Sequence, residues 1–460
     1  MKHAIVGLLV LSGAVLLPAA PGDLVWSYAT GSTVVSSPAV SGGYVYVGSY
    51  DRNVYCLDAA TGAPSWSYET GGLIESCPAV SGGHVYVGSS DDNVYCLDAA
   101  TGALVWSYPT GGNITSSPAV IGGYVYVGSG DRKVYCLDAA TGALVWSYAT
   151  GGGIPSSPAV AGGCVYVGSY DNSVYCLDAA TGALVWSYAT GDDVYSSPGL
   201  SGGYVYVGSQ DNAVYCLDAA TGALVWSYAT GGDIWSSPAL SGGRVYVGSG
   251  DKNVYCLDAA TGAPVWSHAA VSIVFSSPAV SGGYVYVGGM DWDVYCLDAA
   301  TGALAWSYDT GDNVGSSPAV SGGRVYVGNS GYDGTVYCLE AGAGDPGLWP
   351  MFRHDLCHTG SSTPHTAVDL DAGWNLVGCL RWPDTAQQLA DCMIDDGTQL
   401  VWWDDAVAAG LVQHAVYYYR PGYGYRILAA SGGDDDCVRA CVGYWLLTYQ
   451  PDLRLLVPVP

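Results

Sequence analysis

Residues 134–151 read VYCLDAATGALVWSYATG, and the same run recurs unchanged at 174–191 and 214–231. The spacing between these copies is 40 residues. A fixed period of this length is typical of repeat proteins in which each copy is one supersecondary unit that packs on its neighbours. Eight tryptophans keep this spacing without a slip: Trp26, Trp66, Trp106, Trp146, Trp186, Trp226, Trp266 and Trp306.

Each copy divides into four short strands separated by turns. In the first complete copy we predict strands at 36–40, 44–49, 54–59 and 64–70, with Gly and Asp in the turns between them. The strands carry valine on one face and tyrosine on the other, so they need packing on both sides. Four antiparallel strands of this kind form a propeller blade, and eight copies predict an all-β, eight-bladed β-propeller. The alternative is a linear β-solenoid, whose coils are usually shorter and lack four turns.

The last copy indicates how the ring closes. It supplies three strands, at 316–320, 323–329 and 335–341, and lacks the outer strand. The segment 24–30 has the pattern of an outer strand but precedes the first complete copy. We predict that it pairs with 335–341, because this pairing removes an open sheet edge that would invite aggregation. The segment 347–353, which contains a tryptophan followed by proline, competes for the same place.

The run at 56–66, CLDAATGAPSW, is similar to the tryptophan-docking motif of quinoprotein (PQQ) dehydrogenases. The resemblance recurs in eight copies and covers residues 23 to about 350. It implies that each indole locks one blade to the next, so the eight repeated tryptophans are architectural. The copies depart from the usual motif in two ways. They carry cysteine, as at Cys56, where alanine is usual, and they lack the basic residue that often follows the glycine at Gly62.

Proteins with this repeat have different functions, and the fold alone does not separate them. For a PQQ-dependent dehydrogenase the resemblance implies a quinone on the ring axis, a metal held by carboxylate and amide side chains, an aspartate base and often two adjacent cysteines. No two cysteines are adjacent in this sequence, and the copies are too alike to hold one unique set of ligands. We therefore expect no cofactor, no metal and no catalytic residues.

The preferred hypothesis is an exported, non-enzymatic binding or structural protein that uses the propeller as a platform for a protein or a cell-surface glycan. A PQQ-dependent dehydrogenase is the first alternative. A scaffold of the outer-membrane β-barrel assembly machinery is the second. Such scaffolds are generally lipid-anchored, and no cysteine lies near residues 19–22 to carry a lipid. We expect a monomeric propeller.

Residues 1–22 have the layout of a secretory signal peptide, because Lys2 precedes a run of apolar or small residues. An uncleaved membrane anchor is the alternative. After cleavage we expect a protein that does not span a membrane and is periplasmic, displayed at the cell surface or extracellular. The net charge of −27 argues against nucleic acid as a partner. Sixteen of the acidic residues occupy two repeated turn positions, so the copied turns explain much of this charge.

The cysteines fall into two groups. Eight occupy one repeated strand position, and equivalent points on neighbouring blades lie about 10 Å apart, beyond the roughly 7 Å limit for a disulfide. We therefore predict buried thiols there, and we interpret Cys77 and Cys164 as isolated substitutions. The candidates for disulfides lie after the repeats, with a pairing that the sequence does not determine: Cys357, Cys379, Cys392, Cys437 and Cys441.

The domain organisation expected from these patterns is a propeller at 23–346, a linker at 347–366 and a small β-rich C-terminal module at 367–460. In this module we predict strands at 372–378, 416–427 and 442–449. Short helices are expected at 383–395 and 404–412.

Candidate binding residues come from positions at which the copies differ. The residue just before each SSPAV-like run varies from copy to copy, and Tyr195, Trp235 and Phe275 occupy this position in three successive copies. We predict that they form an aromatic arc on the rim at one end of the ring, because aromatic side chains often anchor interfaces. Neutral variation of an exposed loop is the alternative. The full candidate set is Glu75, Thr115, Tyr195, Asp233, Trp235 and Phe275.

Overall fold

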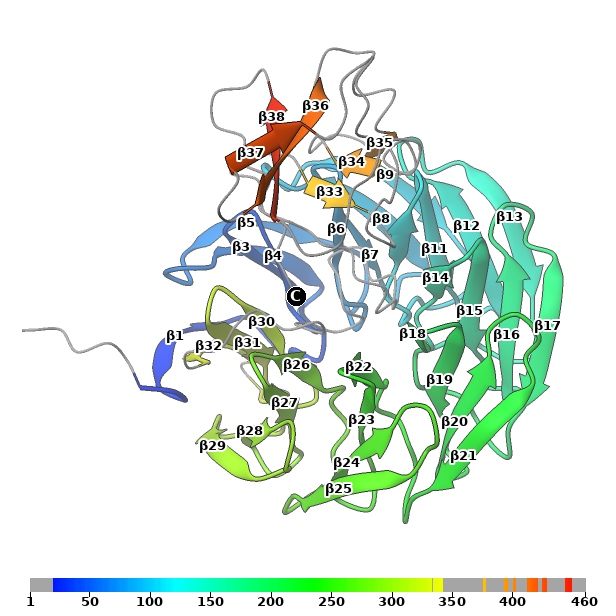
Figure 1. Cartoon of the computed structure of the whole chain (residues 1–460), viewed down its shortest axis with the longest axis vertical. Helices are drawn as coiled ribbons and strands as arrows, with labels where there is room; N and C mark the ends of the chain where they lie inside the picture. Colours follow the sequence, from blue (N-terminus) through cyan, green and yellow to red (C-terminus); the bar gives the residue numbers. More distant parts are fainter. Residues whose placement is uncertain are drawn as a thin grey trace, which may run out of the picture.

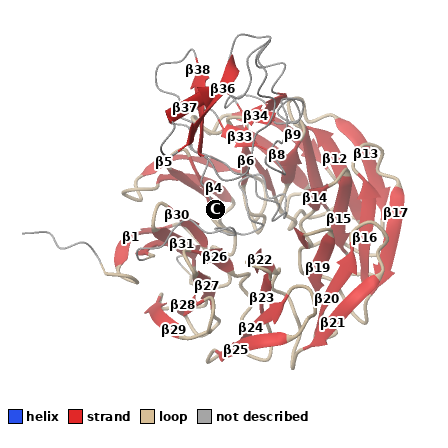
Figure 2. Ribbon diagram, viewed as in Figure 1, coloured by secondary structure: helices blue, strands red, loops and turns tan. Residues whose placement is uncertain are grey.

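The computed structural model describes residues 20–332 and 334–341, together with the strands at 375–377, 393–395, 400–402, 412–420, 424–427 and 443–448. Eight four-stranded antiparallel sheets are arranged around one axis (Figure 1), which confirms the predicted eight-bladed propeller. All regular elements of the described residues are strands (Figure 2). No helix in this part of the chain is long and apolar enough to cross a membrane.

The strands are grouped here by their position in the blade. The innermost strands are β2 (Ala39–Ser41), β6 (Ala79–Ser81), β10 (Ala119–Ile121), β14 (Ala159–Ala161), β18 (Gly199–Ser201), β22 (Ala239–Ser241), β26 (Ala279–Ser281) and β30 (Ala319–Ser321). The second strands are β3 (Tyr44–Gly48), β7 (His84–Gly88), β11 (Tyr124–Gly128), β15 (Cys164–Gly168), β19 (Tyr204–Gly208), β23 (Arg244–Gly248), β27 (Tyr284–Gly288) and β31 (Arg324–Gly328). The third strands are β4 (Asn53–Asp58), β8 (Asn93–Asp98), β12 (Lys133–Asp138), β16 (Ser173–Asp178), β20 (Ala213–Asp218), β24 (Asn253–Asp258), β28 (Asp293–Asp298) and β32 (Thr335–Glu340). The outer strands are β5 (Pro64–Glu69), β9 (Leu104–Pro109), β13 (Leu144–Ala149), β17 (Leu184–Ala189), β21 (Leu224–Ala229), β25 (Pro264–Ala269), β29 (Leu304–Asp309) and β1 (Leu24–Ala29).

Blades 1 to 7 each contain four consecutive strands, from β2–β5 to β26–β29. Blade 8 combines β30, β31 and β32 with β1 from the other end of the repeat region. In this ladder Trp26 lies opposite Cys338 and Tyr28 lies opposite Val336, so the predicted closure is confirmed. The competing segment 347–353 lies outside the described residues.

Each outer-strand tryptophan of blades 8 and 1 to 6 docks on the next blade. The indole N–H of Trp26 donates to the carbonyl of Ala59 at 3.0 Å, and that of Trp66 donates to Ala99 at 2.9 Å. Five further copies repeat the bond, at Trp106, Trp146, Trp186, Trp226 and Trp266. The ring lies against a turn glycine with positive φ, because a Cβ at Gly62 would come within 2.6 Å of Trp26. These seven indoles thus each contact the following blade, which is the arrangement that the resemblance implies.

Blade 8 receives Trp306 differently. Its last turn lacks the Asp-Ala-Ala-Thr-Gly sequence, and Gly22 from the N-terminal side takes the place of the turn glycine. The N–H of Gly22 donates to the carbonyl of Glu340 at 2.7 Å, as Gly62 does to Asp58 at 2.8 Å. Within the described residues the indole nitrogen of Trp306 is buried without a hydrogen-bond partner.

The hydrophobic core is divided among the contacts between blades. One cluster, for example, combines Tyr86 and Cys96 of blade 2 with Ile114 and Leu137 of blade 3. Gly88 is needed at this contact, because a Cβ there would lie 2.1 Å from Ile114. The eight repeated cysteines are at most 1% exposed, and none of the ten cysteines in the described residues forms a disulfide. The predicted buried thiols are thus confirmed.

A closed circle of hydrogen bonds joins the blades near the axis. The N–H of a serine before each innermost strand donates to the corresponding serine hydroxyl of the next blade, as from Ser117 to Ser157 at 2.9 Å. The circle closes from Ser317 back to Ser37 at 2.9 Å. These interblade bonds explain why the innermost strand begins at Ala39 in blade 1 instead of at residue 36 as expected.

Cys77 takes the place of serine in this circle. Its sulfur accepts the N–H of Ser37 at 3.1 Å, and its own N–H donates to the Ser117 hydroxyl at 2.9 Å.

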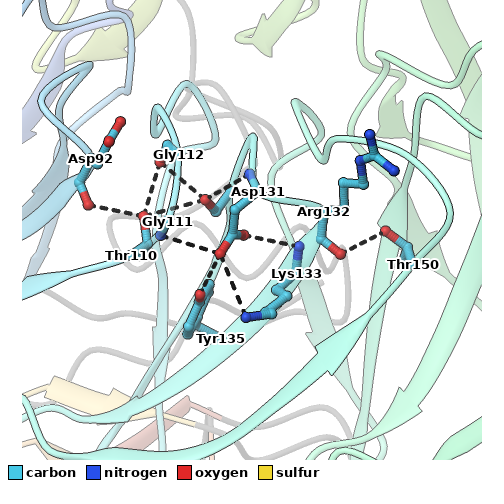
Figure 3. A network of polar contacts seen from close by, with 10 residues as sticks. Asp92, Thr110, Gly111, Gly112, Asp131, Arg132, Lys133, Tyr135 and Thr150 are labelled. Carbon is cyan, nitrogen blue, oxygen red and sulfur yellow. Dashed lines mark hydrogen bonds and ion pairs between the residues drawn. The ribbon is translucent and has the colours of Figure 1, made fainter.

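The repeated aspartate of the turn between the second and third strands joins successive segments. In blade 3, shown in Figure 3, Asp131 accepts the hydroxyl of Tyr135 at 2.6 Å and the N–H of Gly111, from the loop that precedes the blade, at 3.2 Å. Lys133 adds its N–H at 3.1 Å and its ammonium group at 3.8 Å. The repeated acids are therefore structural hydrogen-bond acceptors as well as solvated turn residues. Burial would raise the pKa of Asp51, but hydrogen bonds from Tyr55, Asn53 and Gly31 outweigh it and lower that pKa.

The C-terminal strands form two three-stranded antiparallel sheets, β33-β34-β35 and β37-β36-β38. Their bounds are β33 (Asn375–Val377), β34 (Met393–Asp395), β35 (Leu400–Trp402), β36 (Val412–Arg420), β37 (Gly424–Ile427) and β38 (Gly443–Thr448). Strands occur within all three predicted strand ranges. The helix expected at 383–395 is wrong at its end, because Met393–Asp395 pairs with both neighbouring strands, and such pairing can override local propensity. Residues 1–19 of the predicted signal peptide, the linker and the five C-terminal cysteines lie outside the described residues, whereas Gly22, the last residue of that predicted peptide, packs on Trp306.

We predict that Cys77→Ala destabilises the protein by about 1–3 kcal/mol, because the buried N–H of Ser37 loses its acceptor. Cys77→Ser, which restores the side chain of the other seven blades, should be at least as stable as the parent. Urea unfolding midpoints of the three proteins measure the difference. Equal midpoints for the Ala and Ser variants would show that the circle contributes nothing at this position.

Acid should also destabilise the propeller. Hydrogen bonds lower the pKa of Asp51, Asp91 and Asp251 despite burial, so these groups favour folding above the unfolded pKa of about 3.9 and lose that effect as pH falls through their folded pKa. Unfolding midpoints between pH 7 and pH 2 should therefore drop below roughly pH 4. A midpoint that rises steadily on acidification would mean that relief of the net charge of −27 dominates instead.

Candidate functional site

Two kinds of loop lie together at one end of the ring. One precedes each innermost strand, and the other is the turn between the second and third strands of the same blade. They are joined by backbone hydrogen bonds, from Tyr50 to Thr33 and from Tyr170 to Gly153, both at 2.9 Å. Six side chains from these loops form what we call the axial cluster: Tyr50, Glu75, Tyr170, Tyr195, Trp235 and Phe275.

The aromatic members of the cluster are in contact with one another. Trp235 stacks on Phe275, with ring centroids 5.8 Å apart and an interplanar angle of 28°. Tyr195 lies 5.8 Å from Phe275 and 6.4 Å from Tyr170. Tyr195 precedes blade 5 and Phe275 precedes blade 7, so a ring from one blade reaches past its neighbour. The three predicted aromatics therefore converge toward the axis, more closely than the expected arc along the rim.

Glu75 lies among three of the tyrosines. Burial, the nearby Glu75 carboxylate and a hydrogen bond with it raise the pKa of Tyr50. Burial, Tyr170 and Glu75 raise the pKa of Tyr195, and burial, Asp193 and Glu75 raise that of Tyr170. These phenols are consequently neutral at neutral pH. The cluster thus combines one carboxylate with neutral hydroxyl groups and aromatic rings from blades 1, 2, 4, 5, 6 and 7.

The other two candidates have no observed contact with these rings. Thr115 is partly buried before blade 3, on the same kind of loop. Asp233 joins the two loops of blade 6 through its backbone, because its carbonyl accepts the N–H of Gly250 at 2.9 Å. Asp193 lies closer to the cluster, and burial together with Asp192 and Asp171 raises its pKa.

Tyr50 and Tyr170 were missed by the sequence analysis, although a signal existed. They directly precede the repeated turn aspartate, a position that also varies between copies. The two variable positions are linked, since Trp235 lies over Gly250, where a Cβ would come within 2.9 Å of the indole. Comparing both positions along each blade would have pointed to the same end of the ring.

The cluster does not match the site that a quinone and its metal would need. Among residues 20–332 and 334–341, no three His, Cys, Asp or Glu side chains lie close enough to hold a metal ion. The side chains gathered around Glu75 are aromatic, whereas the resemblance implies carboxylate and amide ligands beside an aspartate base. What this arrangement offers chemically is flat apolar surface next to one negative charge.

Comparison with known proteins gives one family. Its sequence profile matches residues 12–121, 91–196, 189–276 and 251–377, and it is described as outer membrane protein assembly factor BamB. No curated protein sequence is similar enough to count as a relative.

Several solved structures share the fold. BamB from Moraxella catarrhalis is similar with a TM-score of 0.62 and 21% identity, over 69% of this chain and 99% of that chain. The computationally designed Ika8 protein gives 0.63 and 20%, over 69% and 99%. A europium-containing methanol dehydrogenase gives 0.61 and 17%, over 69% and 93%. Identities of 17–21% establish a common architecture and carry no information about function.

Proposed function

Because the chain belongs to the family described as outer membrane protein assembly factor BamB, we propose that it is an exported, non-enzymatic platform that binds a partner protein through the axial cluster. The observation that carries this proposal is the convergence of six side chains, from six blades, at positions that vary between copies in a ring whose other residues are largely copies.

The composition of the cluster supports a binding role. Tyrosine and tryptophan are enriched among residues that dominate binding energy, because they bring large contact area at little cost in side-chain entropy. Tyr170 is 44% exposed, so part of the cluster is accessible to another molecule. The blade core does not need these side chains, since the equivalent positions in other copies hold Val35, Pro155 or Gly315. Their convergence therefore favours selection for contact with another molecule.

The family description favours a protein partner, and a cell-surface glycan is the other outcome that the experiment must separate. An assembly scaffold of the outer-membrane β-barrel machinery would be one form of this proposal. The dehydrogenase alternative draws on the likeness to methanol dehydrogenase, which extends to the fold alone.

We predict that replacing Tyr195, Trp235 and Phe275 together with Ser leaves folding intact but weakens capture of partners from cell-envelope extracts at least about tenfold. The matched control replaces Val145, Val185 and Val225, which are 45–50% exposed on the outer strands of blades 3 to 5. Unfolding midpoints confirm folding, and quantitative pull-downs measure capture. If the axial variant captures as well as the parent, the axial cluster is not the docking site.

A second prediction addresses the enzyme alternative. Mixing the protein with PQQ and calcium should give neither stoichiometric quinone binding nor dye reduction with alcohols and aldose sugars, because the axial side chains do not supply the expected ligands. Equilibrium dialysis measures the bound quinone, and a colorimetric assay measures turnover. Tight binding of one quinone per chain would contradict the proposed binding platform and favour the enzyme alternative.

A further inference from the structure

Among residues 20–332 and 334–341, no lysine or arginine forms an ion pair with the carboxylate of the axial cluster. The two ion pairs among the described residues join Arg52 to Glu69 at 2.9 Å and Lys133 to Asp131 at 3.8 Å. Neither involves Glu75 or Asp193. Asp193 lies near the carboxylates of Asp192 and Asp171 and near the ring of Tyr170, so like charges accumulate beside the cluster. A cationic group arriving at this surface would therefore find uncompensated negative charge.

The rings beside this charge suit a cation as well. The face of an aromatic ring is electron-rich and attracts ammonium and guanidinium groups, most strongly for tryptophan. Trp235 and Phe275 form a nearly parallel pair, and Tyr195 and Tyr170 continue the aromatic surface toward Glu75. A ligand group that lies flat on a ring and bonds to a carboxylate with its edge would use both features at once.

From this juxtaposition we propose that the axial cluster binds the guanidinium group of an arginine side chain on the partner protein. The inference rests on the proposed function and specifies its chemistry. Guanidinium is planar, stacks on aromatic faces, is less hydrated than ammonium and meets a carboxylate with two parallel hydrogen bonds. Glu75 supplies that carboxylate beside Tyr50 and Tyr195, and the aromatic rings of Tyr195, Trp235 and Phe275 supply the stacking surface.

The electrostatic field of the whole chain acts in the same direction. A net charge of −27 attracts a basic segment over a distance and repels an acidic one. A neutral glycan would gain the stacking but not the charge pairing, and a lysine would gain the charge without the planar edge. Small peptides that differ only in this side chain can therefore distinguish arginine binding from binding of lysine or of a neutral group.

The test uses the full-length protein and calorimetric titration with acetyl-Gly-Arg-Gly-amide, against the same peptide carrying citrulline, which is neutral and nearly isosteric, or lysine. The arginine peptide should bind at least tenfold more tightly than the citrulline peptide and more tightly than the lysine peptide. Glu75→Gln should remove the preference for arginine over citrulline. Glu69→Gln is the matched control, because it removes the same charge on the outer strand of blade 1.

Four results would overturn the inference. They are equal binding of arginine and citrulline peptides, no binding of either, equal loss of preference in the Glu69 and Glu75 variants, and competition by the neutral trisaccharide maltotriose but not by arginine. The peptides could show no preference for arginine while the variant with Ser at positions 195, 235 and 275 still loses capture of partners. In that case the axial cluster remains the docking surface, and only the proposed arginine ligand is wrong. If the triple variant also captures normally, both proposals fall.

Discussion

The ring depends on an indole N–H that seven of the eight outer strands donate to an alanine carbonyl of the next blade. A buried hydrogen bond of this kind contributes on the order of 1 kcal/mol, so its larger effect is to fix the angle between blades. The tryptophan must lie against a glycine in the left-handed region, and a tyrosine from the second strand packs on the same indole, as Tyr46 does on Trp66 at 5.9 Å. Glycine at position 62 and its equivalents follows from this contact, because a Cβ there would overlap the indole. The near-identity of the copies is thus a consequence of repeating one interface around a closed circle.

What this interface leaves free is the end of the ring at which the loops meet. The closed circle of serine hydrogen bonds holds the chain near the axis through backbone N–H and hydroxyl groups. The residue two positions before each serine of this circle can therefore change without loss of the contact. This variable position holds Tyr195, Trp235 and Phe275 in blades 5, 6 and 7, and it holds Glu75 in blade 2. Trp235 is accommodated by Gly250 in the adjoining turn, where other copies hold larger residues such as Tyr170. Fold and binding surface are therefore encoded by different positions of the same repeat.

The sequence predicts most of the fold because the repeat converts one local pattern into eight. The register of the tryptophans identifies the blades, and the unpaired pattern at Leu24–Ala29 identifies the closing strand. The start of the innermost strand was placed too early, because the N–H of Ser37 bonds to the neighbouring blade and not to its own sheet. The sequence predicts four of the six residues of the axial cluster but not the contacts between them. Sequence position places Tyr195 and Phe275 two blades apart, and their contact depends on side chains crossing toward an axis whose dimensions no local pattern contains.

The central claim is that a partner docks on the axial end and not on the blade edges. Its most direct measurement is photo-crosslinking in the cells that produce the protein, with a photoreactive residue at position 195 or, for comparison, at the exposed outer-strand position 185. The account predicts a defined protein adduct from position 195 and none from position 185. An adduct from position 185 alone would contradict it.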